Sequence, residues 1–370
     1  MFDVDIDQFW KDDELAHQDN CFSKNAPQAA LGIRMSDECV FAELGETGEP
    51  WGYTPRERRI ELNKRYNDKA EKTVGKRLLR ESFPLPDEFF PPVREIGEVF
   101  GGRYITSAHS TWLEDSCSTP QELEKVLDRV EKINLREFIF PPQWESEKKR
   151  ISEEYGKKPD LWRHVRGPVT LATSIYGSEN LIFLIMDEPE LAERFSRVVS
   201  DVIFQYASIF DNEAGYETGK APSGFHFSDD NCCLLRPEMY ELFGYPVLKR
   251  IFDQWSPNPG DERYQHSDSD MGHLLPMLGK LNLTGCNFGP NVLVDEIRKH
   301  MPDTRIDGCL SPLAFMHNDA EQVINEVKRD CEAAKEFRGL NLATAGSINY
   351  GSLLSSMRTV MYVIQNYGRY

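Results

Sequence analysis

Three side chains that could bind a metal or move a proton lie within five residues of one another, at His266, Asp268 and Asp270. The stretch Arg263–Asp268 is predicted as a short polar strand, and alternate side chains of a strand point to the same face. One imidazole and two carboxylates on one face could form a metal site or a proton-transfer site. The alternative is a solvated turn in which Asp268 or Asp270 caps the helix predicted from Gly272.

The elements that would position these side chains recur as strand–helix units. At least six such units follow one another from about Gly101, with short connections. This repetition predicts an α/β fold, a (β/α)8 TIM barrel whose active site lies where the strands end. Polar or sulfur-bearing residues gather at the predicted strand ends, namely Asp229, Asp230, His266, Asp268, Asp307 and Cys309.

Helix starts are the clearest local signals. Thr119 followed by Glu122 has the pattern of a capping box. Asp187 is predicted to cap a long helix that has Pro189 in its first turn. Asp319–Phe337 is predicted as an amphipathic helix, and Leu353–Tyr367 as the last helix.

Residues 1–95 differ in composition from the rest of the chain. They are charged, rich in proline and only weakly periodic, with a solvated helix predicted within Arg56–Arg80. Their apolar content is too low for a separate core. We therefore predict an N-terminal extension, residues 1–95, packed on a barrel formed by residues 96–370.

The composition of the chain limits the kinds of molecule that it is expected to bind. The chain has 43 Lys and Arg residues against 61 Asp and Glu, a formal net charge of −18, which disfavours nucleic-acid binding. It contains no long apolar run and no signal-peptide pattern within Met1–Asp13, so no membrane association is expected. The eight cysteines form no CxxC pair and are typical of free thiols in a cytoplasmic protein. A homodimer is the default expectation for its oligomeric state.

Several motifs, in this order, make residues 95–370 resemble the uroporphyrinogen decarboxylase superfamily of (β/α)8 barrels. They are Gly167-Pro168-Val169-Thr170-Leu171-Ala172, Phe227-Ser228-Asp229-Asp230, His266-Ser267-Asp268 followed by Leu274-Leu275-Pro276, and Tyr367-Gly368. True decarboxylases of this superfamily carry an N-terminal Met-Arg-Gln-Ala-Gly-Arg-Tyr segment whose arginines bind substrate carboxylates. Here the nearest stretch has a single arginine, Arg34, and the decarboxylases' Gly-His-Gly is replaced by Ala345-Gly346-Ser347. Porphyrinogen decarboxylation is therefore not expected.

The superfamily's other branch comprises corrinoid-dependent methyltransferases, which bind zinc through His-x-Cys and a later cysteine. His266 matches the first ligand, Asp268 stands at the second, and the later position falls near Gly346. The resemblance implies a zinc held by carboxylates, with Asp230 and Cys309 as further candidate ligands. Such a site is similar to that of O-demethylase methyltransferases, which move a methyl group from a methoxylated small molecule, such as an aryl methyl ether, to cobalamin. The chain lacks an Asp-x-His-x-x-Gly corrinoid signature, so a separate corrinoid protein would carry the cobalamin.

The remaining site candidates follow from position alone. The catalytic set is predicted as Asp229, Asp230, His266 and Asp268, although Asp229 and Asp230 could instead cap the helix starting at Pro237. The substrate-binding candidates are Tyr176, Glu179, Asn180, His109 and His226. Two alternatives to methyl transfer stay open. One is a metal-independent decarboxylase or lyase acting on another carboxylate, and the other is a barrel without catalysis.

Overall fold

The computed structural model describes residues 2–48, 50–107, 110–217 and 219–370. Seven strands form one parallel sheet in the order β1-β9-β8-β7-β6-β5-β4. These strands are β1 (Ala30–Leu31), β4 (His164–Arg166), β5 (Phe225–Ser228), β6 (Arg263–Ser267), β7 (Gly285–Phe288), β8 (Arg305–Asp307) and β9 (Leu340–Leu342). Two further strands, β2 (Arg103–Ser107) and β3 (Ser110–Glu114), pair antiparallel. The parallel sheet with helices between successive strands confirms the predicted α/β fold and is consistent with a (β/α)8 barrel.

The chain divides into two compact units. The first comprises Met1–Phe83, His266–Leu275 and Leu283–Tyr370, and the second comprises Pro84–Gln265 and Pro276–Asn282. The division passes through β6, between Gln265 and His266. The boundary predicted near residue 95, between an extension and a barrel, stays a prediction.

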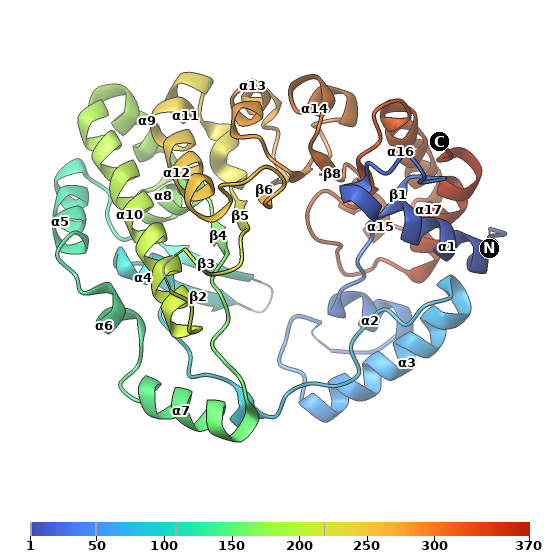
Figure 1. Ribbon diagram of the computed structural model, residues 1–370, viewed down its shortest axis with the longest axis horizontal. Coiled ribbons are helices and arrows are strands. Elements are labelled where there is room, and N and C mark those ends of the chain that lie inside the picture. Colours follow the sequence, from blue (N-terminus) through green and yellow to red (C-terminus); the bar gives the residue numbers. More distant parts are fainter. Residues whose placement is uncertain (1, 49, 108–109, 218) are drawn as a thin grey trace. The chain divides into compact units, whose positions relative to one another are not determined.

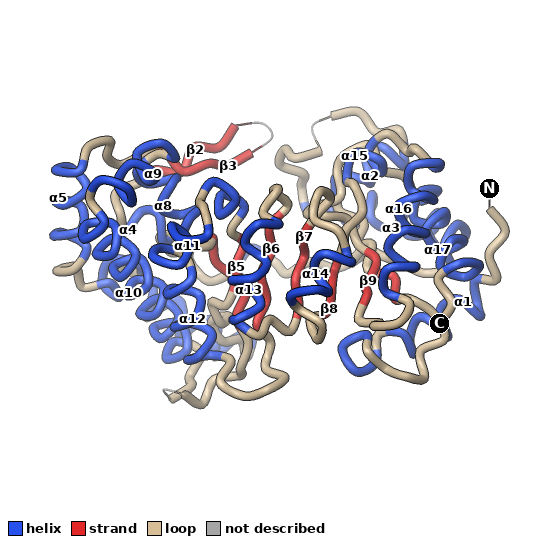
Figure 2. The backbone as a smooth tube through the Cα atoms, turned by 90° about the horizontal axis from the view of Figure 1, so that it is seen from above, coloured by secondary structure: helices blue, strands red, loops and turns tan. Residues whose placement is uncertain are grey.

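The first unit contains strands β7, β8 and β9, which lie side by side in Figure 2. Strand β1 pairs in parallel with β9, with Ala30 opposite Asn341, in a part of the chain for which the sequence predicted no strand. Figure 1 shows the last two helices packed against each other, in agreement with their many close contacts. The helices of this unit are α1 (Ile6–Ala16), α2 (Asp37–Leu44), α3 (Arg56–Val74), α14 (Val294–His300), α15 (Pro312–Met316), α16 (Ala320–Ala334) and α17 (Leu354–Tyr367).

The second unit is built around one long helix. Phe195 of this helix, α10, makes edge-on ring contacts with Phe100, Tyr176 and Phe243. These rings are all buried and form part of the core of this unit, and Figure 1 shows α10 running beside its neighbouring helices. The helices of this unit are α4 (Ile96–Val99), α5 (Pro120–Val130), α6 (Leu135–Ile139), α7 (Trp144–Tyr155), α8 (Pro168–Tyr176), α9 (Ser178–Asp187), α10 (Pro189–Glu213), α11 (Pro237–Phe243) and α12 (Tyr245–Trp255).

Two of the predicted helix starts are confirmed and one is wrong. Thr119 and Glu122 form a capping box at α5, and Asp319 caps α16 by accepting a hydrogen bond from Gln322 N. Asp187, however, is the last residue of α9, and Glu188 is the N-cap of α10. The reason is Pro189, because a residue that precedes proline is forced out of the helical region, and Glu188 has φ −133° and ψ 60°.

All eight cysteines are free, and seven are buried. Among the described residues, no single helix has the length and apolar character needed to cross a membrane. In the described part of the chain, one pair of helices, α8 and α9, bent by 103° at their junction, meets that criterion of length and composition when taken together.

A buried arginine, Arg298, connects two loops of the first unit through hydrogen bonds. Arg298 of α14 donates through Nη1 to the carbonyls of Met301, Pro302 and Thr304. Through Nη2 it donates to the carbonyls of Arg338 (2.7 Å) and Gly339 (2.8 Å), immediately before β9. Burial lowers the pKa of Arg298 because the charged form loses its hydration. Its planar guanidinium thus donates hydrogen bonds to carbonyls of two separate loops, residues 301–304 and 338–339.

We predict that Arg298→Ala lowers the free energy of unfolding by about 3 kcal/mol or more, because several buried carbonyls lose their donor together. Arg298→Lys should recover little, because an ammonium cannot reach both loops at once. Urea unfolding measures both values. Arg194→Ala is the control, since it removes surface ion pairs with Asp128 and Glu131 and should change stability far less. An Arg298→Ala protein as stable as the control would contradict this role.

Candidate metal centre

The local structure of β6 fixes where His266 and Asp268 point. Gln265 and Ser267 are fully buried, whereas His266 is half-buried and Asp268 is exposed just beyond the strand. His266 and Asp268 thus lie on the face opposite Gln265 and Ser267, as the alternation predicts. The strand ends at Ser267, so this alternation does not extend to Asp270.

Each of these side chains has a close neighbour in the first unit. His266 Nδ1 lies 2.8 Å from Asn287 Oδ1, on β7. Asp268 packs against Gly346, where a Cβ atom would come within 2.7 Å of Asp268 Oδ2. Gly346 also has φ +77°, a conformation that favours glycine. The Asp268 carboxylate therefore occupies the space that a side chain at position 346 would need.

Within the first unit, His266 and Asp268 each offer a candidate ligand atom, and these two atoms lie within 4.8 Å of each other. They are two of the four metal ligands expected from the sequence. An imidazole and a carboxylate are donors that suit zinc and other divalent ions with a preference for nitrogen and oxygen. This pair of side chains therefore fits a divalent metal. Asp230 belongs to the second unit, and its part in the same site stays a prediction.

In the second unit, Asp229 directly follows β5 and is fully buried. Its Oδ1 accepts a hydrogen bond from the backbone N–H of Thr170 at 2.7 Å, in the first turn of α8. Burial raises the pKa of Asp229 to about 7, because the charged form is poorly solvated there. Asp229 therefore anchors the start of α8. The alternative drawn from the sequence was that Asp229 caps the helix starting at Pro237. That helix is α11, and its N-cap is Arg236. Asp230 opens the short 3₁₀ helix η3 (Asp230–Leu234).

Three substrate-binding candidates lie at the junction of α8 and α9. Tyr176 is buried at the end of α8, with its ring edge-on to Phe195. Asn180 donates a hydrogen bond from Nδ2 to the carbonyl of Tyr176 at 2.8 Å, and Glu179 is exposed in the first turn of α9. Through these contacts, Tyr176 and Asn180 help to hold the junction of α8 and α9 together. Their role in substrate binding stays a prediction.

The remaining candidates have separate surroundings. His226 of β5 is hydrogen-bonded through Nε2 to Glu262 at 2.8 Å and stacks on the ring of Tyr264. Cys309 is fully buried, and burial raises the pKa of its thiol well above the usual range. This shift disfavours the thiolate that a metal would require. His109 lies outside the described residues.

Asn287 is a candidate site residue that the sequence interpretation missed. It is a buried amide within β7, a strand whose four residues are all buried. A single polar residue in a short apolar strand is a weak sequence signal for a functional site. Asn287 becomes a candidate because its side chain is hydrogen-bonded to His266.

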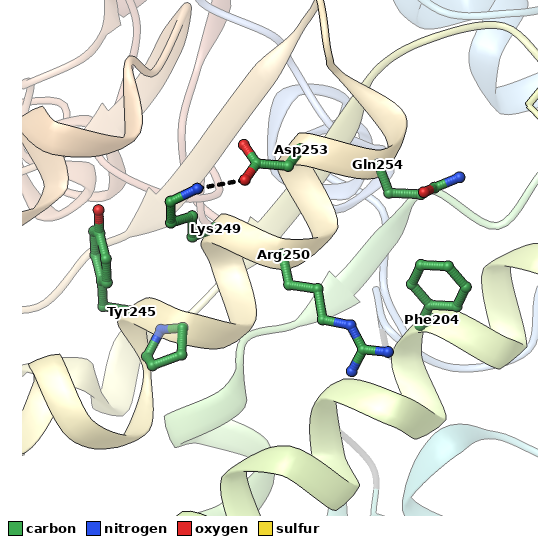
Figure 3. Close-up of a pocket in the computed structure, with 7 residues that line it drawn as sticks. Phe204, Tyr245, Lys249, Arg250, Asp253 and Gln254 are labelled. Carbon is green, nitrogen blue, oxygen red and sulfur yellow. Dashed lines mark hydrogen bonds and ion pairs between the residues drawn. The ribbon is translucent and has the colours of Figure 1, made fainter.

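A separate cavity lies between α10 and α12 of the second unit (Figure 3). It has a volume of about 610 Å³ and is lined by Phe204, Tyr245 and charged residues of α12. Lys249 pairs with Asp253 there, and Arg250 pairs with Asp201. None of the predicted site residues lines it.

Comparison with known proteins decides the family. The family model described as uroporphyrinogen decarboxylase (URO-D) matches residues 116–367, more than half of the chain. The chain belongs to this family. The predicted superfamily is thereby confirmed, and its motifs lie within or next to the matched region.

Solved structures agree on the fold. A methyltransferase from Methanosarcina mazei superposes with a TM-score of 0.56 at 14% sequence identity, covering 96% of this chain and 97% of the other. Altogether 23 chains of solved structures match, whereas no curated protein matches in sequence. At such low identity, the likeness to the methyltransferase establishes a shared fold.

Gly167, immediately before α8, makes room for Asp229. A Cβ atom at position 167 would lie 2.2 Å from Asp229 Cβ. We predict that Gly167→Ala lowers the free energy of unfolding by about 1–3 kcal/mol through this overlap. Backbone strain should not contribute, since Gly167 has φ −63°. Urea unfolding measures the change, with Gly272→Ala as the control, because a Cβ there meets only Val292 at 3.9 Å. Equal stability of the two variants would show that Asp229 is not held tightly.

Proposed function

We propose that the protein is a methyltransferase that moves a methyl group from a methoxylated small molecule, an aryl methyl ether, to the cobalt of a separate corrinoid protein. The observation that carries this proposal is the pair of His266 and Asp268 in the first unit, whose candidate ligand atoms lie within 4.8 Å of each other. The name of the Methanosarcina mazei neighbour, a methyltransferase, supports the same reaction class.

In the proposed reaction, the bond between the methyl carbon and the ether oxygen breaks. The electron pair of that bond leaves with the phenolate oxygen, and an electron pair from cob(I)alamin forms the new bond to the methyl carbon. A bound divalent metal would supply Lewis acidity, which polarises the ether oxygen and improves the leaving group.

The residues of the chain would hold and tune this Lewis acid. His266 would provide a neutral nitrogen ligand, and Asp230 and Asp268 would provide two anionic oxygens that balance the charge of a divalent ion. Hard oxygen ligands suit a metal that polarises an oxygen, whereas thiolate ligands suit thiol activation. The carboxylate at Asp268, in the space beside Gly346, therefore favours an ether over a thiol as the group that is activated.

The family match also supports a second candidate, a metal-independent decarboxylase or lyase acting on another carboxylate, because the family takes its name from a decarboxylase. Metal content separates the two candidates, since only the methyltransferase needs an ion at His266.

We predict near-stoichiometric zinc in the wild-type protein purified without chelators and its loss in His266→Ala, because the imidazole is the only nitrogen ligand proposed. Elemental analysis measures both. The matched control is His226→Ala, another strand histidine, whose ring is paired with Glu262, and this variant should keep its zinc. A wild-type protein that stays metal-free when zinc is supplied would contradict the proposal, as would a His266→Ala protein that retains zinc.

Removal of the metal provides the functional test. We predict that a chelator abolishes methyl transfer from aryl methyl ethers to cob(I)alamin, because the ether oxygen is then no longer polarised. Added zinc should restore the transfer. Absorbance spectroscopy follows the conversion of cob(I)alamin to methylcobalamin. Methyl transfer that continues at an unchanged rate after complete metal removal would exclude Lewis-acid activation.

A further inference from the structure

Asn287 makes four hydrogen bonds from a buried position. Its Nδ2 donates to the carbonyl of Asp307, at the end of β8, and to the carbonyl of Thr344 at 3.0 Å. Its Oδ1 accepts from the backbone N–H of Gly346 at 2.9 Å and lies 2.8 Å from His266 Nδ1. The two amide hydrogens are thereby both used, and Oδ1 has two neighbours, one for each lone pair.

These partners fix the orientation of the amide. If the amide were turned over, its oxygen would face the carbonyl oxygens of Asp307 and Thr344, and its NH2 group would face the N–H of Gly346. All three contacts would then be repulsive, in a buried place where unsatisfied polar groups are costly. The atom that faces His266 is therefore Oδ1, which can only accept a hydrogen bond.

The orientation of Asn287 in turn fixes the tautomer of His266. Because Oδ1 accepts, His266 Nδ1 must carry the proton. In a neutral imidazole with a proton on Nδ1, the lone pair lies on Nε2. A metal binds the nitrogen that has this lone pair, and the hydrogen bond of the other nitrogen holds the ring in place.

We propose that Asn287 is a positioning residue that holds His266 in its Nδ1–H tautomer and so presents Nε2 as the metal ligand. Through Gly346 N, the same amide also holds the loop that packs against Asp268. The metal in this statement rests on the proposed function. The tautomer rests only on the hydrogen bonds of Asn287.

A purely structural role is the alternative, because Asn287 joins β7 to the ends of β8 and β9. Two variants separate these roles. Asn287→Ala removes the acceptor for His266 together with both donors. Asn287→Asp keeps an acceptor for Nδ1–H but cannot donate to the carbonyls of Asp307 and Thr344. The aspartate variant should therefore lose stability and still keep the tautomer.

The tautomer can be measured on metal-free protein. The chain has eight histidines, and ¹⁵N-labelling of their rings allows two-bond ¹H–¹⁵N correlation spectra at a pH where they are neutral. His266→Gln identifies the His266 signals. We expect the Nδ1–H pattern in the wild type and in Asn287→Asp, and a pattern containing the Nε2–H tautomer in Asn287→Ala.

Zinc affinity, measured by competition with a chromogenic chelator, gives the second readout. Asn287→Ala should weaken zinc binding by about 10- to 100-fold, the usual effect of removing such a partner. Asn287→Asp should weaken it by less than about tenfold.

The matched control is Asn67→Ala, in α3 of the same unit. Asn67 is also buried, donates to the carbonyl of Leu79 and to Glu81, and accepts from the N–H groups of Leu78 and Leu79. Its loss should lower stability in urea unfolding and leave zinc affinity unchanged.

Two results would overturn the proposal. One is an Asn287→Ala protein that keeps the Nδ1–H tautomer, and the other is an Asn67→Ala protein that loses as much zinc affinity as Asn287→Ala. If the wild-type protein binds no zinc, the proposed function fails, and the spectra of the metal-free proteins still decide the role of Asn287.

Discussion

Buried polar side chains at the carboxyl ends of the strands need hydrogen-bond partners, and in each unit such a side chain lies next to a candidate metal ligand. In the second unit, Asp229 is fully buried and binds the first turn of α8 through Thr170 N. In the first unit, Asn287 joins β7 to the carbonyls of Asp307 and Thr344. The candidate ligands are immediate neighbours of these anchors, because Asp230 follows Asp229 in the chain and His266 bonds to Asn287. Buried anchors thus provide rigidity, and more exposed neighbours provide donor atoms.

Two glycines make this arrangement possible by lacking a side chain. A Cβ atom at Gly167 would overlap Asp229, and one at Gly346 would overlap the carboxylate of Asp268. The second case bears on the chemistry. The sequence resemblance implies that zinc methyltransferases carry a ligand cysteine near position 346, and here Asp268 occupies the space that a side chain at this position would need. A side chain at position 346 and the present position of Asp268 therefore exclude each other.

The sequence predicts the parts of the structure that depend on local patterns. Alternation along β6 gave the face of His266 and Asp268, and the capping box gave the start of α5 at Thr119. Other features depend on contacts distant in sequence. Strand β1 has two residues and is defined by its pairing with β9. The hydrogen bonds of the Asn287 side chain connect it to partners 20 to 59 positions away in the sequence. The error at Asp187 has a local cause, because the constraint from Pro189 acts on Glu188 and moves the helix start by one residue.

Electrostatics adds an argument on the choice of reaction. Asp268 places a carboxylate close to His266 in the first unit, in a chain whose formal net charge is already −18. A metal-independent lyase would have to bind an anionic carboxylate substrate beside this negative charge, which repels it. A methyl ether is uncharged and meets no such repulsion. A divalent ion at the proposed site would balance the charge of the aspartate ligands, so the carboxylate beside His266 favours metal-assisted methyl transfer over decarboxylation without a metal.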